Sequence, residues 1–151
     1  MKNQDPFHEA KESLQTVQRE YTATGSINAA TAYIIVHAAE NAIRELYTVA
    51  TSADFPYDHE QFRNHVPEKM VRNLGLGQYY SPQMQTFLGQ LTGYAPQDIR
   101  FENTRAFKDH TNPKSAGRGK ELLDGLTQFI EETEKLQKNP AVLQTIRSWN
   151  P

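Results

Sequence analysis

The chain has 151 residues and a formal net charge of −2, and we expect residues 1–151 to form a single domain with a substantial core. Because it has no cysteine, it can form no disulfide and no thiolate metal site. The near-neutral charge provides no general attraction to nucleic acid or to an anionic membrane, and any such partner must bind a local patch. Apolar runs are all shorter than the roughly 18 residues of a membrane span and the first residues are polar, so we expect a cytoplasmic protein that has neither a membrane segment nor an export signal.

The N-terminal part of the chain predicts two helices. Apolar residues from Phe7 to Tyr21 recur at steps of three and four, which predicts a helix of about five turns that ends at Gly25. Ser26 is a typical N-cap for a second helix that continues to about Ser52. Apolar residues cover most of the circumference of this second helix, so we predict that it is the central helix of the fold. They are Ile35, Val36, Ala39, Ala42, Ile43, Leu46, Tyr47, Val49 and Ala50.

The predicted central helix also has a narrow polar stripe. Its members are His37, Glu40, Asn41, Arg44 and Glu45. Glu40 and Arg44 are four residues apart, so we predict that they pair, because a charge in a tight bundle is retained when it has a partner. Two interpretations of His37 remain open: it lines a cleft together with Glu40, or it makes an ordinary polar contact between helices.

Proline and glycine divide the middle of the chain. Residues 53–58 contain a Phe-Pro step and predict a loop. A short helix is expected from His59, disturbed by Pro67, with its end at the glycines of residues 75–77. The Ser-Pro step at residues 81–82 predicts the start of a further helix that stops at Gly93.

The C-terminal third begins with an irregular segment. Residues 94–113 have no sustained periodicity and predict a long loop, which in a compact domain usually has a function. Helical periodicity returns from Ser115 and continues to about Lys138, and the Asn-Pro step at residues 139–140 caps a last short helix. No segment predicts a strand. We therefore expect an all-α bundle of about five helices with a short C-terminal helix.

The central helix resembles a known signature. Residues 33–46 contain an Ala-Ala-Glu step that ends at Glu40 and is followed by the basic Arg44, similar to the signature helix of the HEPN superfamily. Two later features agree in order: His59 resembles the histidine of the turn that follows this helix, and Arg100, followed by an aromatic residue, resembles a step before the last long helix. The resemblance implies a helical bundle that is often dimeric.

The resemblance also implies a catalytic pair. Many HEPN proteins are metal-independent ribonucleases of toxin–antitoxin or phage-defence systems, and they have an arginine four to six residues before a histidine. Arg105 and His110 have this spacing. An imidazole can take a proton from a ribose 2′-hydroxyl or return one to the leaving oxygen, while a guanidinium binds the scissile phosphate. Because each chain has one such histidine, we expect a homodimer that brings two motifs together.

The catalytic candidates lie in a basic segment. Residues 100–120 contain six basic residues and two acidic residues, and Arg100 and Lys108 are the candidates for phosphate binding. There is also a simpler interpretation. A chain with 5 histidines acquires an Arg-His spacing of this kind by chance, and a basic segment beside an acidic helix can be an ordinary solvated surface.

The resemblance implies an alternative function as well. Other HEPN proteins lack the motif and are associated with nucleotide binding or with a nucleotidyltransferase antitoxin. In that case the ligand-binding residues are His37, Glu40 and Arg44, together with His59 and Arg100. His59 has an alternative role in fixing the turn after the central helix. We expect no metal site, because the sequence has no His-x3-His or Glu-x2-His spacing on one helix face. We also expect no cofactor and no DNA partner.

Overall fold

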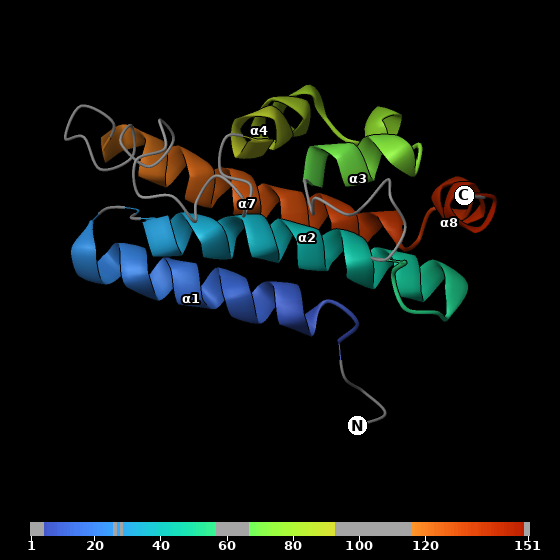
Figure 1. The fold of residues 1–151 in the computed structure, drawn as a ribbon, viewed down its shortest axis with the longest axis horizontal. Coiled ribbons are helices and arrows are strands. Elements are labelled where there is room, and N and C mark those ends of the chain that lie inside the picture. The colour runs from blue at the N-terminus through green and yellow to red at the C-terminus, as the bar shows by residue number, and fades with distance from the viewer. Residues whose placement is uncertain (1–4, 26, 28, 57–66, 93–115, 150–151) are drawn as a thin grey trace.

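The computed structural model describes residues 5–25, 27, 29–56, 67–92 and 116–149 (Figure 1). These residues form six α-helices and one short 3-10 helix, and they contain no strand. The predicted all-α fold class is therefore confirmed. Within these ranges, no helix has both the length and the apolar character that a membrane crossing needs.

The first two helices follow the sequence signals closely. Helix α1 (His8–Thr24) ends at Gly25, whose φ of 71° is left-handed and whose N–H donates to the carbonyl of Tyr21 at 2.7 Å. Helix α2 (Ala29–Thr51) ends directly before Ser52, as predicted. The predicted N-cap Ser26 lies outside the described residues.

The middle helices follow. Helix α3 (Pro67–Asn73) has Pro67 as its first described residue, and the helix that we expected before this proline falls on residues 59–66, outside the described part of the chain. The 3-10 helix η2 (Gly77–Tyr79) and helix α4 (Pro82–Thr92) follow. The expected start near His59 and the stop at Gly93 lie outside the described residues.

A glutamate of another helix holds the start of α4. The backbone N–H of Ser81 donates to Oε1 of Glu132 at 3.0 Å, and the Ser81 hydroxyl donates to Oε2 of the same carboxylate at 2.8 Å. Gln128 also donates to Oε2, at 2.7 Å. The predicted Ser-Pro start is therefore confirmed, and Glu132 fixes it from outside the helix.

The last two helices also match the prediction. Helix α7 (Ala116–Leu136) is long, and helix α8 (Pro140–Arg147) is short. Oδ1 of Asn139 accepts from the backbone N–H of Ala141 at 3.0 Å, so the predicted cap of the last helix is confirmed. The predicted loop at residues 94–113 lies outside the described part of the chain.

Helix α2 is central in the packing. It contacts α1, α3, α7 and α8, and Figure 1 shows α1, α2 and α7 side by side along the long axis of the molecule, with α3 and α4 against them. The predicted apolar rows of α2 are buried, except that Tyr47 and Val49 are half-buried. Gly125 of α7 lets α4 approach closely, because any Cβ at this position would collide with the ring of Phe87. The core therefore surrounds α2.

Candidate functional site

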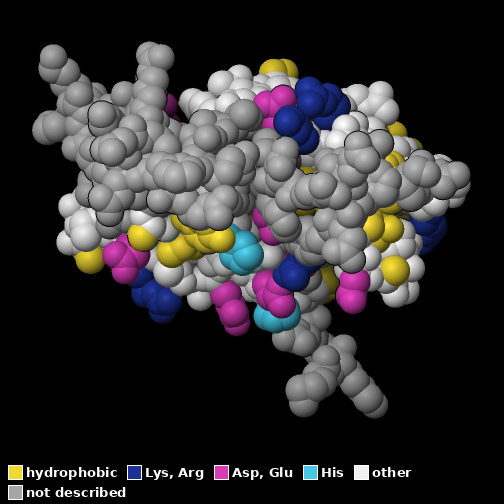
Figure 2. Space-filling view, in the orientation of Figure 1, with side chains coloured by type: hydrophobic (Ala, Val, Ile, Leu, Met, Phe, Trp, Pro, Cys, Tyr) yellow, Lys and Arg dark blue, Asp and Glu magenta, His cyan; other side chains and the backbone are white. Residues whose placement is uncertain are grey.

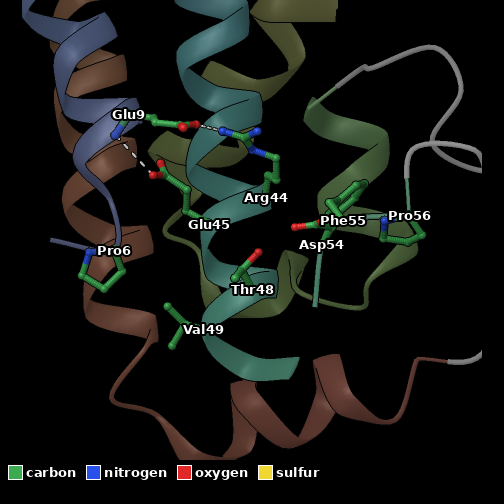
Figure 3. A pocket seen from close by; sticks show the side chains of 9 residues that line it. All are labelled: Pro6, Glu9, Arg44, Glu45, Thr48, Val49, Asp54, Phe55 and Pro56. Atoms are coloured by element: carbon green, nitrogen blue, oxygen red, sulfur yellow. Dashed lines mark hydrogen bonds and ion pairs between the residues drawn. The ribbon is translucent and has the colours of Figure 1, made fainter. Parts of the chain in front are cut away.

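A cavity of about 710 Å³ lies beside the C-terminal half of α2 (Figure 3). The start of α1, the exposed side of α2 and the segment after α2 form its walls. The lining residues are Pro6, Glu9, Arg44, Glu45, Thr48, Val49, Asp54, Phe55 and Pro56. We call this space the α1–α2 cavity. Its volume is in the range of pockets that bind small molecules.

Glu45 joins α2 to the first turn of α1. Its Oε2 accepts from the backbone N–H of Glu9 at 3.2 Å, and its Oε1 accepts from the N–H of Ala10 at 3.0 Å. Amides in the first turn of a helix have no partner within the helix, and Phe7 at the N-cap position provides no side-chain acceptor. Glu45 therefore caps α1 from the neighbouring helix (Figure 3).

Burial changes the ionisation of Glu45. The residue is 8% exposed, and this burial raises the pKa of its carboxyl group to about 7 from the usual 4.5. The hydrogen bond from Ala10 and the positive charges of Arg44 and His8 lower the pKa, but their sum is smaller than the cost of burying the charge. At neutral pH, a substantial fraction of the Glu45 carboxyl group is therefore protonated.

Arg44 contacts α1 rather than its own helix. Its guanidinium forms an ion pair with the carboxylate of Glu9, seen as a dashed line in Figure 3. We had predicted a pair with Glu40, so the structure corrects that prediction for the partner of Arg44. The physical reason is that α1 lies along α2 at this level, which brings an acid of α1 within reach of the guanidinium.

The rest of the predicted polar stripe lies nearer the start of α2. Glu40 is buried, and its Oε1 lies 4.0 Å from Nδ1 of His37. The side chain of His37 is 51% exposed and stacks on the ring of Tyr33, with 6.3 Å between the ring centroids. Neither His37 nor Glu40 lines the α1–α2 cavity. Of these three residues, only Arg44 therefore lines the cavity.

The remaining predicted site residues lie outside the described ranges. They are the catalytic candidates Arg105 and His110 and the binding candidates His59, Arg100 and Lys108. Their roles stay predictions from the sequence.

Of the nine residues that line the cavity, only Arg44 was predicted from the sequence as part of a site. Thr48 donates a hydrogen bond from its hydroxyl to the carbonyl of Ala53 at 3.0 Å, which fixes the turn after α2. This turn places Asp54 and Phe55 in the cavity wall, and the ring of Phe55 packs edge-to-face on Tyr47 at 5.3 Å. No local sequence pattern predicts these residues as part of a site, because the way in which the chain folds back after α2 brings them together at the cavity.

The charges around the cavity limit its ligands. Glu9, Glu45 and Asp54 line the cavity together with Arg44, whose guanidinium is already paired with Glu9. Figure 2 shows acidic, basic and histidine side chains interspersed over the lower part of the visible face, where α1 and α2 lie. The described walls therefore offer little to a phosphate group. Among the described residues, no group of three or more His, Asp or Glu side chains is arranged to hold a metal ion.

No protein family, characterised protein or solved structure matches this chain.

Proposed function

We propose that this chain is a HEPN-like ribonuclease that cleaves RNA without a metal, as a homodimer, in a toxin–antitoxin or phage-defence system. The observation that carries the proposal is the spacing of Arg105 and His110 within a basic segment. An all-helical frame with one long central helix supports it, because the HEPN resemblance requires such a frame. The Ala-Ala-Glu step of that resemblance lies on α2 and ends at the buried Glu40.

The chemistry follows from the two side chains. The neutral imidazole of one His110 takes the proton of a ribose 2′-hydroxyl, and the 2′-oxygen then forms a bond to the adjacent phosphorus. The bond from phosphorus to the 5′-oxygen breaks, and a protonated second imidazole gives its proton to that leaving oxygen. Arg105 stabilises the charge that develops on the phosphoryl oxygens. Two protomers supply the two imidazoles, so dimerisation is part of the mechanism.

We assign RNA binding to the basic segment rather than to Arg44. Phosphate contacts dominate the affinity for nucleic acid. Arg44 is paired with Glu9 and lies among carboxyl groups, whereas residues 100–120 have a local excess of basic side chains. In this proposal, Arg100 and Lys108 bind phosphates, and Arg44 has a structural role.

A cleavage assay with matched histidine variants tests the proposal. RNA is incubated with the purified protein in excess chelator, and rates are compared for the parent, His110→Ala and His37→Ala. Because a positioned acid or base contributes about 100- to 10,000-fold, we expect His110→Ala to lose at least 100-fold. His37 is half-exposed on α2, so its variant should stay within about 3-fold of the parent, as for an ordinary surface change. Equal cleavage by the parent and His110→Ala would contradict the proposal.

The α1–α2 cavity favours a second candidate function, a non-catalytic HEPN-like module that binds a nucleotide or a nucleotidyltransferase partner. The cavity has room for a small molecule, and Arg44 lies in its wall. Its three carboxyl groups favour contacts to a base or ribose over contacts to phosphates. A nucleoside should therefore stabilise the protein at least as much as the corresponding triphosphate, by about 2.7 kcal/mol at a concentration of 100 Kd. Unchanged melting temperatures across nucleosides and nucleotides, together with no partner recovered by pull-down, would contradict this function.

A further inference from the structure

The α1–α2 cavity has apolar walls as well as polar ones. Pro6 before α1, Val49 of α2 and Pro56 in the segment after α2 supply the apolar walls. Val49 and Pro56 are half-buried, so a ligand that fills the cavity covers apolar surface there and gains from its removal from water. Ligand sites in proteins typically combine such walls with a small number of polar groups that orient the ligand.

Two of the three carboxyl groups in the wall already have partners. Both oxygens of Glu45 accept from backbone N–H groups, those of Glu9 and Ala10. The carboxylate of Glu9 pairs with the guanidinium of Arg44, so these two charges offset each other. Glu45 and Glu9 therefore hold α1 against α2.

Asp54 is the third acid, and its charge is not offset within the described part of the chain. Its side chain makes no hydrogen bond or ion pair with another described residue, and Figure 3 shows its carboxylate pointing into the cavity. The neighbouring carbonyl of Ala53 accepts from the Thr48 hydroxyl, which keeps Asp54 beside Thr48. Because the Thr48 hydroxyl has donated its proton, its oxygen can only accept from a ligand. An uncompensated negative charge and a second acceptor therefore lie next to the apolar walls.

We propose that the α1–α2 cavity binds a small organic cation, an alkylammonium with an apolar body. The ammonium group donates to the Asp54 carboxylate and to the Thr48 hydroxyl, and the apolar body lies against Val49 and Pro56. The proposal concerns the cavity alone and does not depend on the ribonuclease function. Its ligand class also differs from the nucleosides of the second candidate function, so the two can be distinguished by experiment.

The charges of the wall select a cation over other ligands of similar shape. An anion meets the carboxylate of Asp54, and the guanidinium of Arg44 is already paired. A neutral ligand makes the same apolar contacts but leaves the charge of Asp54 without a partner. An ammonium group supplies the opposite charge together with three N–H donors for the acceptors of the wall.

A titration followed by amide NMR tests the ligand class in the full chain. The probe is phenethylammonium, and phenethyl alcohol is its control because it has the same ring and chain without the charge. We expect the ammonium to shift the amide signals of Thr48, Val49 and Asp54 and to leave that of Thr86 in α4, which does not line the cavity, unchanged. The alcohol should bind about 3- to 10-fold more weakly, because Asp54 is exposed and water weakens its charge-assisted contacts.

A matched pair of variants locates the charge that binds the probe. Asp54→Asn removes the carboxylate from the cavity, and Glu131→Gln removes an acid from an exposed position of α7. Both variants change the net charge equally, so long-range effects of net charge are matched. The ammonium should bind Asp54→Asn about 3- to 10-fold more weakly than the parent, and it should bind Glu131→Gln within about 2-fold of the parent.

Several results would overturn the proposal. They are equal binding of the ammonium and the alcohol, equal binding of the ammonium to the parent and to Asp54→Asn, shifts confined to residues outside the cavity wall, and no shifts at all. If Asp54→Asn does not fold, the comparison of the ammonium with the alcohol in the parent decides. Binding of adenosine without binding of the ammonium would also overturn the proposal, and it would leave the cavity to the second candidate function.

Discussion

Two helices of this protein have N-termini that are held by a glutamate of a different helix, and the two glutamates have opposite ionisation behaviour. Glu45 of α2 holds the start of α1, and burial raises its pKa to about 7. Glu132 of α7 holds the start of α4. Burial also opposes its ionisation, but the donors Ser81 and Gln128 together outweigh this effect and lower its pKa. The same type of contact thus leaves Glu45 partly protonated near neutral pH and keeps Glu132 ionised.

The difference lies in depth and in the number of donors. Glu45 is buried and accepts from two backbone amides, whereas Glu132 is half-buried and accepts from a backbone amide, a hydroxyl and a side-chain amide. Charge-assisted hydrogen bonds favour the ionised form, and loss of hydration disfavours it. The balance between hydrogen bonding and loss of hydration, and not the presence of a cap, therefore decides whether each glutamate is ionised.

The two sites should affect stability at opposite ends of the pH range. The raised pKa of Glu45 adds stability below pH 4.5, which is lost as the pH rises through 7. The lowered pKa of Glu132 adds stability above 4.5, which is lost as the pH falls through its folded value.

The largest expected effect comes from Glu45→Ala. It leaves the amides of Glu9 and Ala10 without an acceptor beside a buried surface, so the free energy of unfolding at pH 5 should fall by about 2 to 3 kcal/mol. Urea denaturation measures this loss. Glu131→Ala, at an exposed position on α7, is the control and should change the stability by less than about 0.5 kcal/mol. Equal effects of the two variants would mean that Glu45 does not hold α1.

Glu45→Gln isolates the charge from the cap. The amide brings no charge into the buried site, but it has only one oxygen, so one of the two α1 amides loses its acceptor. The net gain in stability over the parent at pH 8 should therefore be about 1 kcal/mol. At pH 4.5 the advantage should nearly disappear. Thermal unfolding at the two pH values checks this. A variant that is less stable than the parent at pH 8 would contradict the raised pKa.

Glu132→Gln should have the opposite sign. Its NH₂ group cannot accept from Ser81 or Gln128, so we expect a loss of about 1 kcal/mol at pH 7 that disappears as the pH falls through the lowered pKa of Glu132. Asn139→Ala is the comparator, because it removes a neutral cap and should cost about 1 kcal/mol at every pH. The comparison between the glutamates fails if Glu132→Gln is as insensitive to pH as Asn139→Ala.

The smallest expected effect is that of Ser81→Ala. This variant removes the hydroxyl donor but keeps the backbone N–H that binds Glu132, so it should cost about 0.5 to 1 kcal/mol at pH 7. The Glu132 pKa should rise toward the usual value, because one of its donors is lost. NMR titration of the carboxyl carbon measures the shift, and an unchanged midpoint would show that the hydroxyl contributes nothing.

The helix ends could be predicted from the sequence because their signals are local. Gly25 supplies a left-handed φ, and Asn139 supplies a side-chain cap, each within a few residues of the helix it terminates.

The site was less predictable, because its contacts join distant parts of the chain. The sequence marked Glu45 as a charged residue on an apolar helix, but its partners are backbone amides of α1, which every residue other than proline has. Arg44 had a suitable acid four residues earlier, and only the packing of α1 against α2 selects Glu9 instead. The roles of Arg105 and His110 remain predictions from their spacing.

The chemical identity of the RNA ends formed in the presence of chelator tests the proposed function most directly. Cleavage by attack of the 2′-hydroxyl leaves a 2′,3′-cyclic phosphate on one fragment and a 5′-hydroxyl on the other, and mass spectrometry of the fragments distinguishes these ends from others. We expect these ends from the parent and no fragments from His110→Ala. Fragments with 5′-phosphate ends, or no fragments from the parent, would contradict the account.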